Sequence, residues 1–541
     1  MLLRDKGFHM DIAAENDLTI VDAIYRQVSF KPDAIAYRSH DARLSFADLE
    51  RATNQIANAL VGMNVGRGDR VACLTKHHLP CILLTLAACK VGAVCMPVNW
   101  RLDANELDYI LGHGEAKFLL ADQSFLEGVA KNLAPTTLQM LQKTVCSEGT
   151  AGAVPGFADW YSAHSKKFTM VPAKLDDAAL QLYSSGTTGL PKGVVLSHRG
   201  LLSTSRTVSH DWGFGAEGVL GNPLPTFHVA GITLLLLTLY TGGQTIAYSE
   251  FDPASFLNSV AAQGITHAFL VPAMLLFLFQ TPDANKRDYS TLKLIAYGGS
   301  PISDRVLEDS MRLFQCDFLQ VYGLTEVSGP ATFLNQQDHR DAAIRPDLLR
   351  SAGKPVGGAR LRIVDPVTHK TLPAGSTGEI WIETERNLKE YWRDPKATDA
   401  AFPEGRNANG GWFRTGDGGY EQDGYLFIHD RIKDMIISGG ENIYPAEIEN
   451  LLMKHPAIAD GAIIGVPDPT WGESVKAVVV LKPDVQLQER ELINWMRERM
   501  AHFKCPKSVD FVEAMPRNPT GKLLKRVLRE PYWQGKQRAV N

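Results

Sequence analysis

The segment from Tyr183 to Val194 constrains this chain more than any other, because it joins two apolar, strand-like runs through a loop that cannot pack a core. Its letters are YSSGTTGLPKGV, with four serines and threonines, three glycines and one lysine. Glycines let the backbone approach a ligand closely, and N–H groups, hydroxyls and a lysine direct dipoles and charge at it. We interpret the segment as a polyphosphate-binding loop. Its spelling departs from the P-loop, since Gly193 follows Lys192 where Ser or Thr is expected. A flexible surface turn is the alternative.

Length and composition set outer bounds on the class of protein. A chain of 541 residues predicts several folding units. The formal net charge of −4 lacks the basic footprint of a nucleic-acid partner. The seven cysteines form no Cys-x-x-Cys pair, which favours reduced thiols and a cytoplasmic location.

Membrane insertion is not expected either. The most apolar run, from Ala230 to Tyr240, is shorter than the roughly 20 residues that span a bilayer, and we interpret it as a buried helix. Met1 to Met10 contain no apolar signal core. We therefore expect no transmembrane segment.

Hydrophobic periodicity predicts alternating strands and helices before and after the loop. Helices are predicted over 46–63, 79–91 and 104–113, with Ser45 as an N-cap and Gly92 as a C-cap. Strands are predicted over 34–37, 71–74, 93–98, 117–121, 268–271, 292–296 and 318–321. This alternation is typical of a parallel α/β layer. Residues 134–174 are polar, and we expect them to be irregular and peripheral.

Two further segments carry polar groups suited to a nucleotide. In Tyr322–Glu326, the tyrosine can stack on a base, Gly323 permits close approach, Thr325 offers a hydroxyl and Glu326 a hard oxygen for Mg²⁺. Asp417 is predicted to lie on a glycine-flanked turn, from which its carboxylate can accept hydrogen bonds from two hydroxyls. A solvated glutamate and an ordinary Asp-Gly turn are the alternatives.

These segments and Pro516–Lys522 (PRNPTGK) follow the order and spacing of the adenylate-forming enzymes, and the chain resembles this superfamily in its acyl-CoA synthetase, or fatty-acid–CoA ligase, branch. The resemblance implies an α/β fold with a large N-terminal AMP-binding domain, residues 1–432, built from two α/β subdomains and a small β-barrel. It also implies a small, mobile α+β C-terminal lid domain, residues 433–541, that hinges at Lys433.

The resemblance assigns site residues as follows. ATP or AMP would contact Ser184, Ser185, Gly186, Thr187, Thr188, Gly189, Lys192, Gly298, Gly299, Ser300, Tyr322, Gly323, Thr325, Asp417, Ile428, Arg431 and Lys522. The acyl pocket would be lined by His228, Val229, Gly231, Ile232, Tyr297, Gly298, Val327 and Gly329. His228 would help to hold the substrate carboxylate, and Ile232 stands where some long-chain members carry an aromatic gate. The glycines indicate room for a medium- or long-chain fatty, aryl or alicyclic acid.

The implied reaction uses ATP, Mg²⁺ and CoA in two steps. A carboxylate first attacks the α-phosphate, and Thr187, Thr188, Lys192, Lys522 and Mg²⁺ at Glu326 would offset the repulsion between the anions. The resemblance implies that the catalytic residues are Thr188, His228, Glu326 and Lys522. The lid would then turn about Lys433 and present Ser438, Gly439, Gly440, Glu441 and Trp471 to CoA.

Several alternatives stay open. Cys505 stands where several ligases carry an arginine for the CoA 3′-phosphate, and Lys504 or Lys507 would have to substitute. An acyl-AMP ligase or stand-alone adenylation enzyme with a non-CoA acceptor is one alternative, and a nucleotide-binding protein without turnover is another. The oligomeric state is open, with a homodimer as one option.

The two-step division of labour predicts the effect of Lys522→Ala. Because this lysine would stabilise charge only during adenylation, acyl-AMP formation should fall on the order of 10²–10³-fold or more. Thioester formation from supplied acyl-AMP and CoA should be largely retained. Separate assays of the two half-reactions test this, and an equal loss of both would refute it.

Overall fold

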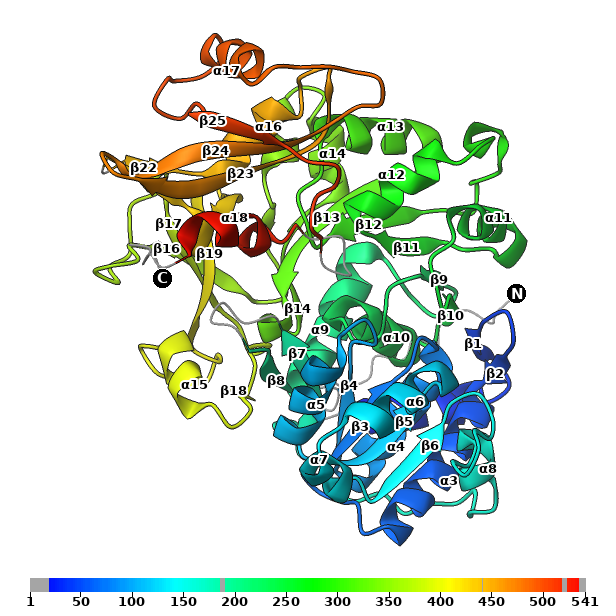
Figure 1. The fold of residues 1–541 in the computed structure, drawn as a ribbon. Coiled ribbons are helices and arrows are strands. Elements are labelled where there is room, and N and C mark those ends of the chain that lie inside the picture. Colours follow the sequence, from blue (N-terminus) through cyan, green and yellow to red (C-terminus); the bar gives the residue numbers. More distant parts are fainter. Residues whose placement is uncertain (1–18, 185–189, 440, 518–522, 535–541) are drawn as a thin grey trace.

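A computed structural model describes residues 19–184, 190–439, 441–517 and 523–534. The chain forms a large mixed α/β N-terminal domain and a small C-terminal domain, which lies against one end of it (Figure 1). No helix in these described ranges is long and apolar enough to cross a membrane.

The first sheet of the large domain has seven strands and carries the phosphate loop. Its order is β18-β8-β7-β4-β3-β5-β6. The pairs β7–β4, β4–β3, β3–β5 and β5–β6 are parallel, whereas β7–β8 and β8–β18 are antiparallel. The strands are β3 (Arg70–Leu74), β4 (Val94–Pro97), β5 (Ala116–Ala121), β6 (Lys143–Cys146), β7 (Ala178–Ser184), β8 (Lys192–Ser197) and β18 (Glu390–Tyr391).

The second sheet has nine strands, in the order β15-β14-β13-β12-β11-β9-β10-β1-β2. Its centre, from β13 to β1, is parallel, and both edges are antiparallel. The strands are β1 (Ile35–Arg38), β2 (Arg43–Ser45), β9 (Val219–Asn222), β10 (Gln244–Ala247), β11 (His267–Leu270), β12 (Leu294–Gly298), β13 (Asp317–Leu324), β14 (Gly329–Leu334) and β15 (Lys354–Pro355).

Two smaller sheets follow along the chain. The expected small barrel is a four-stranded antiparallel sheet, β16-β17-β19-β20, whose edge strands β16 and β20 are not paired with each other. The C-terminal domain has a five-stranded sheet, β22-β21-β24-β23, with β25 on β24. The strands are β16 (Arg360–Val364), β17 (Gly378–Glu383), β19 (Trp412–Gln422), β20 (Tyr425–Arg431), β21 (Ile436–Ser438), β22 (Glu441–Ile443), β23 (Ile458–Asp468), β24 (Gly472–Leu481) and β25 (Ser508–Phe511).

Helices cover the faces of these sheets (Figure 1). The α-helices are α2 (Ile20–Phe30), α3 (Phe46–Gly62), α4 (His78–Val91), α5 (Ala104–His113), α6 (Gln123–Asn132), α7 (Pro135–Met140), α8 (Phe157–Ser162), α9 (His198–Trp212), α10 (Val229–Thr241), α11 (Pro253–Gln263), α12 (Pro272–Gln280), α13 (Asp304–Phe314), α14 (Gln336–Asp341), α15 (Pro395–Ala401), α16 (Pro445–Leu452), α17 (Glu489–Arg497) and α18 (Lys525–Trp533). Short 3₁₀ segments are η1 (Ala284–Lys286), η2 (Thr325–Val327), η3 (Pro346–Arg350) and η4 (Ile432–Asp434).

Local sequence signals explain the best-predicted boundaries. Ser45 caps α3 through a reciprocal pair of hydrogen bonds with Asp48, which satisfies backbone donors that the first turn leaves unpaired. Gly92 ends α4 in the left-handed conformation (φ +74°), which favours glycine. The helices predicted over 46–63, 79–91 and 104–113 are thereby confirmed as α3, α4 and α5 within one residue of each predicted end.

Two predictions about the first half of the chain were wrong. Residues 134–174 are not wholly irregular, because β6 pairs in parallel with β5 and buries Val145 and Cys146 completely. The strand at 34–37 does not join the layer formed by β3, β4 and β5. It is β1, and it pairs with β10 in the other sheet, a long-range pairing that local periodicity cannot reveal.

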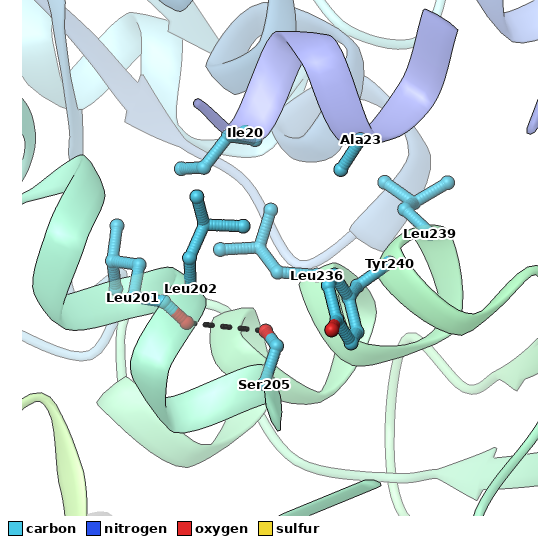
Figure 2. A pocket seen from close by; sticks show the side chains of 8 residues that line it. All are labelled: Ile20, Ala23, Leu201, Leu202, Ser205, Leu236, Leu239 and Tyr240. Atoms are coloured by element: carbon cyan, nitrogen blue, oxygen red, sulfur yellow. Dashed lines mark hydrogen bonds between the residues drawn. The ribbon is translucent and has the colours of Figure 1, made fainter. Parts of the chain in front are cut away.

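The apolar run at 230–240 is the predicted buried helix. It forms α10, whose residues from Gly231 to Leu239 are all buried. Figure 2 shows where α10 meets α2 and α9, around a pocket lined by Ile20, Leu202, Leu236 and neighbouring side chains. The pocket holds about 10 Å³, room for no more than one water molecule, and belongs to the core.

Two of the glycines near the expected acyl pocket, Gly231 and Gly298, do not provide room, contrary to the prediction. A methyl group built at Gly231 would collide with the carbonyl oxygen of Pro225, and one at Gly298 with that of Val321. These glycines let α10 approach the preceding loop and β12 approach β13. Gly299 differs, because its φ of +82° itself favours glycine.

Gly231→Ala should therefore destabilise the N-terminal domain by about 1–3 kcal/mol through overpacking. Helix propensity alone would predict a gain of about 1 kcal/mol, so the sign of the effect discriminates between the two. Gly62→Ala is the matched control, since Gly62 is also helical and has no neighbouring atom within 4 Å of the added methyl. A Tm measured by scanning fluorimetry should fall for Gly231→Ala only, and equal Tm values would contradict the packing argument.

Candidate active site

The phosphate loop joins β7 to β8 as a hairpin. Its described ends are in register, with Tyr183 opposite Gly193 and Ser184 opposite Lys192. The amino group of Lys192 lies 5.0 Å above the ring of Tyr391, which belongs to β18 on the outer edge of β8. The flanks of the loop are thus held by backbone pairing, and Lys192 stands at its exit.

Glu326 lies beside this hairpin, although it is far from it in sequence. Its Oε1 accepts hydrogen bonds from the hydroxyls of Ser184 at 3.0 Å and of Tyr391 at 3.4 Å. Its backbone carbonyl accepts from the N–H of Leu388 at 2.7 Å. The structure therefore brings the predicted Mg²⁺ ligand next to the predicted phosphate loop.

The segment that carries Glu326 is held by hydrogen bonds to α9 and to Arg386. Glu326 lies in η2, which ends at Ser328 in the left-handed conformation. The carbonyl of Ser328 accepts from Thr204 of α9, and its hydroxyl donates to the carbonyl of Arg386. Arg386 is fully buried and donates to the Thr207 hydroxyl and to a backbone carbonyl. These bonds hold in place the segment that carries the Glu326 carboxylate.

A second polar cluster continues from the same strand. β13 extends through Tyr322 and Gly323 to Leu324, three residues further than predicted. The hydroxyl of Tyr322 donates to Asp417 at 2.7 Å, and Arg431 lies 3.5 Å from the other oxygen of that carboxylate. Burial and the neighbouring Asp417 raise the pKa of Tyr322. Burial lowers the pKa of Arg431, but Asp417 and Glu326 outweigh it, so that its pKa is raised.

Asp417 does not lie on a turn, which corrects the prediction. It sits within the long strand β19, directly opposite Arg431 of β20, and its side chain is buried. Gly416 has φ +71° and a register shift follows Gly418, so the glycines serve an irregular strand. Glycines around an aspartate are equally typical of turns, which explains the error.

His228 immediately precedes α10 but makes no capping bond. Its Nε2 is shielded from water and has no hydrogen-bond partner among the residues that the structure describes. Burial, and then the positive charge of Arg101, lower the pKa of His228 to about 4. The imidazole is therefore neutral at pH 7 and has one ring nitrogen to offer a ligand.

Other predicted pocket residues face the core. The Tyr297 ring is fully buried and its hydroxyl bonds to His339 at 2.9 Å, so it packs in the core of the second sheet. Ile232 and Val327 are also fully buried, in the main core cluster. Two predicted pocket residues, Val229 and Gly329, are half-buried. Three predicted nucleotide contacts, Ser300, Thr325 and Ile428, are also half-buried.

The predicted CoA-facing segment is the hairpin of β21 and β22. Ser438 pairs with Glu441 across it and with Gly472 of β24. The N–H of Gly439 donates to the carbonyl of Trp471 at 2.8 Å, and the indole, 54% exposed, lies against this glycine. The structure thus brings Trp471 to the hairpin.

Several predicted residues cannot be placed. Ser185, Gly186, Thr187, Thr188, Gly189, Gly440 and Lys522 lie outside the described residues, and only the backbone of Lys433 is described, in η4. Two residues near the site were not predicted, Tyr391 and Arg101. Tyr391 reaches Glu326 only because β18 pairs with β8, and no local pattern signals that pairing.

The β7–β8 hairpin, the Glu326 carboxylate and the buried Tyr322–Asp417–Arg431 cluster thus lie near the carboxyl ends of parallel strands, where α/β proteins commonly bind ligands. Comparison with known proteins agrees. The family model described as "AMP-binding enzyme" matches residues 24–392, and "AMP-binding enzyme C-terminal domain" matches 447–522. The chain belongs to the AMP-binding enzyme family.

Relatives match along almost the whole chain. A fatty acid–[acyl-carrier-protein] ligase, ScoC of Streptomyces coeruleorubidus, is 36% identical over 97% of this chain and 98% of its own. A long-chain-fatty-acid–CoA ligase, FadD13 of Mycobacterium tuberculosis, is 33% identical over 93% and 96%. MatB of Rhodopseudomonas palustris is 31% identical over 95% of this chain and 99% of its own, with a TM-score of 0.86 in its ATP-bound form and 0.76 in its apo form.

Asp417→Asn should raise the KM for ATP roughly 10- to 150-fold, which corresponds to one charged hydrogen bond lost. The control is Asp423→Asn, since Asp423 is exposed at the far tip of the same β19–β20 hairpin. ATP–pyrophosphate exchange measures both variants. An unchanged KM for Asp417→Asn would show that this carboxylate does not contact the nucleotide.

Proposed function

We propose that the protein is an AMP-forming carboxylate–CoA ligase that activates a hydrophobic carboxylic acid through acyl-AMP. The observation that carries the proposal is the position of Glu326, which accepts hydrogen bonds from Ser184 of the phosphate hairpin and from Tyr391 of β18, the strand beside it. A carboxylate at this point can hold the magnesium of Mg·ATP next to phosphate. The Tyr322–Asp417–Arg431 cluster provides groups for the base, the ribose and a phosphate.

In the proposed first step, an oxygen of the substrate carboxylate bonds to the α-phosphorus and the bond to pyrophosphate breaks. The main barrier is repulsion between anions. His228 is neutral, so it can orient the carboxylate by a hydrogen bond but cannot offset its charge. Cations must do so, and we assign this role to Lys192, Arg431 and Lys522.

Magnesium fits the side chains present. Mg²⁺ prefers oxygen ligands and in such sites is held by one or two carboxylates together with substrate phosphates. Glu326 is half-buried and offers a carboxylate, while Ser184 and Thr325 add nearby hydroxyl oxygens. When bound, the ion would neutralise phosphate charge during adenylation.

The acid is proposed to be apolar beyond its carboxylate. The ring of Phe227 lies 4.4 Å from that of His228, and Trp100 packs edge-on against Phe227. Such surroundings favour a fatty or aryl chain over acetate. Since Gly231 and Gly298 do not provide room, chain length has to be measured.

In the proposed second step, the C-terminal domain, residues 433–541, turns about Lys433 and a CoA thiol attacks the acyl carbon. The carbon–sulfur bond forms, the thiol proton is released and AMP leaves. CoA fits the described residues in one respect, because the exposed Trp471 beside the β21–β22 hairpin can stack on an adenine.

A carrier-protein acceptor is the second candidate. ScoC, a fatty acid–[acyl-carrier-protein] ligase, is 36% identical along 97% of this chain. Both acceptors present a thiol on a phosphopantetheine arm, so adenylation would be the same.

We further propose a cytoplasmic location, for which the seven unpaired cysteines argue.

A panel of fatty, aryl and alicyclic acids with Mg·ATP should give pyrophosphate release, and added CoA should give equal amounts of AMP and consumed thiol. EDTA should abolish release, and Glu326→Gln should lower kcat/KM on the order of 10²-fold. Glu308→Gln, an exposed glutamate of α13, is the control. No release with any acid would refute the enzyme, and thiol consumption only with a phosphopantetheinylated carrier protein would favour the second candidate.

A further inference from the structure

Four aromatic rings form a column on one face of the β19–β20 hairpin. Tyr420 and Phe427 are directly opposite each other, with ring centroids 4.9 Å apart and planes at 8°. His429 lies two residues beyond Phe427 and packs on Tyr420 at 5.1 Å. Tyr444 then stacks on His429 at 4.8 Å and 25°. Offset stacks at these distances are attractive.

The last contact of the column joins the two domains. Tyr420, Phe427 and His429 belong to the four-stranded sheet of the N-terminal domain, whereas Tyr444 immediately precedes α16 of the C-terminal domain. Between His429 and Tyr444 the chain passes through η4, where we place the hinge, and through the β21–β22 hairpin. A turn of the C-terminal domain at η4 carries Tyr444 away from His429.

Two ion pairs connect α18, near the end of the described chain, to α16, which follows Tyr444, and to η4. Lys525 of α18 lies 3.0 Å from Glu449 of α16, and Arg529 of α18 lies 2.7 Å from Asp434 of η4. Both pairs are shielded, since none of the four side chains is more than 20% exposed. They tie α18 to α16 and to Asp434, the residue after the proposed hinge Lys433, and Lys522 is only three residues before Lys525 in sequence.

We propose that His429 and Tyr444 are positioning residues: their stack is a latch that holds the C-terminal domain in the arrangement used for acyl-AMP formation. This rests on the proposed two-step function. Taken over the whole chain, the structure matches ATP-bound MatB with a TM-score of 0.86 and apo MatB with one of 0.76, as expected if the domains are arranged as in the ATP-bound form. Opening the stack frees α16, and with it α18, to turn.

The size of the effect follows from the strength of one aromatic pair. Loss of the His429–Tyr444 stack should shift the balance between the two arrangements by a factor of about 2 to 13. The ratio of the adenylation rate to the thioesterification rate should fall by that factor. A residue that only stabilises the fold would lower both rates together.

The test measures both half-reactions of the full-length protein. Single-turnover pyrophosphate release without CoA reports adenylation, and supplied acyl-AMP with CoA reports thioesterification. His429→Val, Tyr444→Leu and the double variant form a cycle. We expect each single variant to lower the ratio and the double variant to lower it no further. His429→Tyr and Tyr444→Phe keep a ring and should retain the wild-type ratio.

Phe427→Leu is the matched control, because it removes a stack of the same column that lies within one domain. It should leave the ratio unchanged. An unchanged ratio in His429→Val and Tyr444→Leu, additive effects in the double variant, or a rise in the ratio would each overturn the latch. If the wild-type protein itself carried out neither half-reaction, the proposed function would fail instead, so the two failures are distinguishable.

Discussion

The carboxylate of Glu326 is the point on which the site depends. It lies just beyond β13 of the nine-stranded sheet, and its hydrogen bonds come from Ser184 and Tyr391, which belong to the seven-stranded sheet. The bond from the N–H of Leu388, two residues before β18, to the Glu326 carbonyl adds a third connection. One acidic residue thereby joins the end of β7 and strand β18 to the segment that follows β13. Under the proposed function, a carboxylate held in this way is preorganised, as electrostatic catalysis requires.

The positive charge of Arg431 lies close to Glu326, at the boundary between the two domains. Arg431 ends β20 and lies among the carboxylates of Asp417, Glu326 and Asp434, all of which raise its pKa. The guanidinium therefore stays charged and faces both the site and η4. A nucleotide phosphate would compete with these carboxylates for Arg431.

The sequence predicted elements well where local signals are strong, and poorly where partners are distant. The capping box at Ser45 and the left-handed Gly92 involve neighbours within four residues, and both boundaries were correct. By contrast, β1 joined an unexpected sheet through β10, and β6 was missed. The glycine pattern around Asp417 has two structural solutions, a turn and an irregular strand, and only pairing with β20 selects the strand.

By itself, the sequence determined which residue types are available, namely a segment rich in Ser, Thr, Gly and Lys that suits a phosphate and an acidic residue directly after a strand. These are properties of short segments, since residue type and backbone freedom suffice to specify them. Only the tertiary structure decided which distant groups meet. Tyr391 reaches Glu326 and Tyr444 reaches His429 through strand pairing and packing. Such contacts arise from the burial of whole layers, which no local pattern encodes.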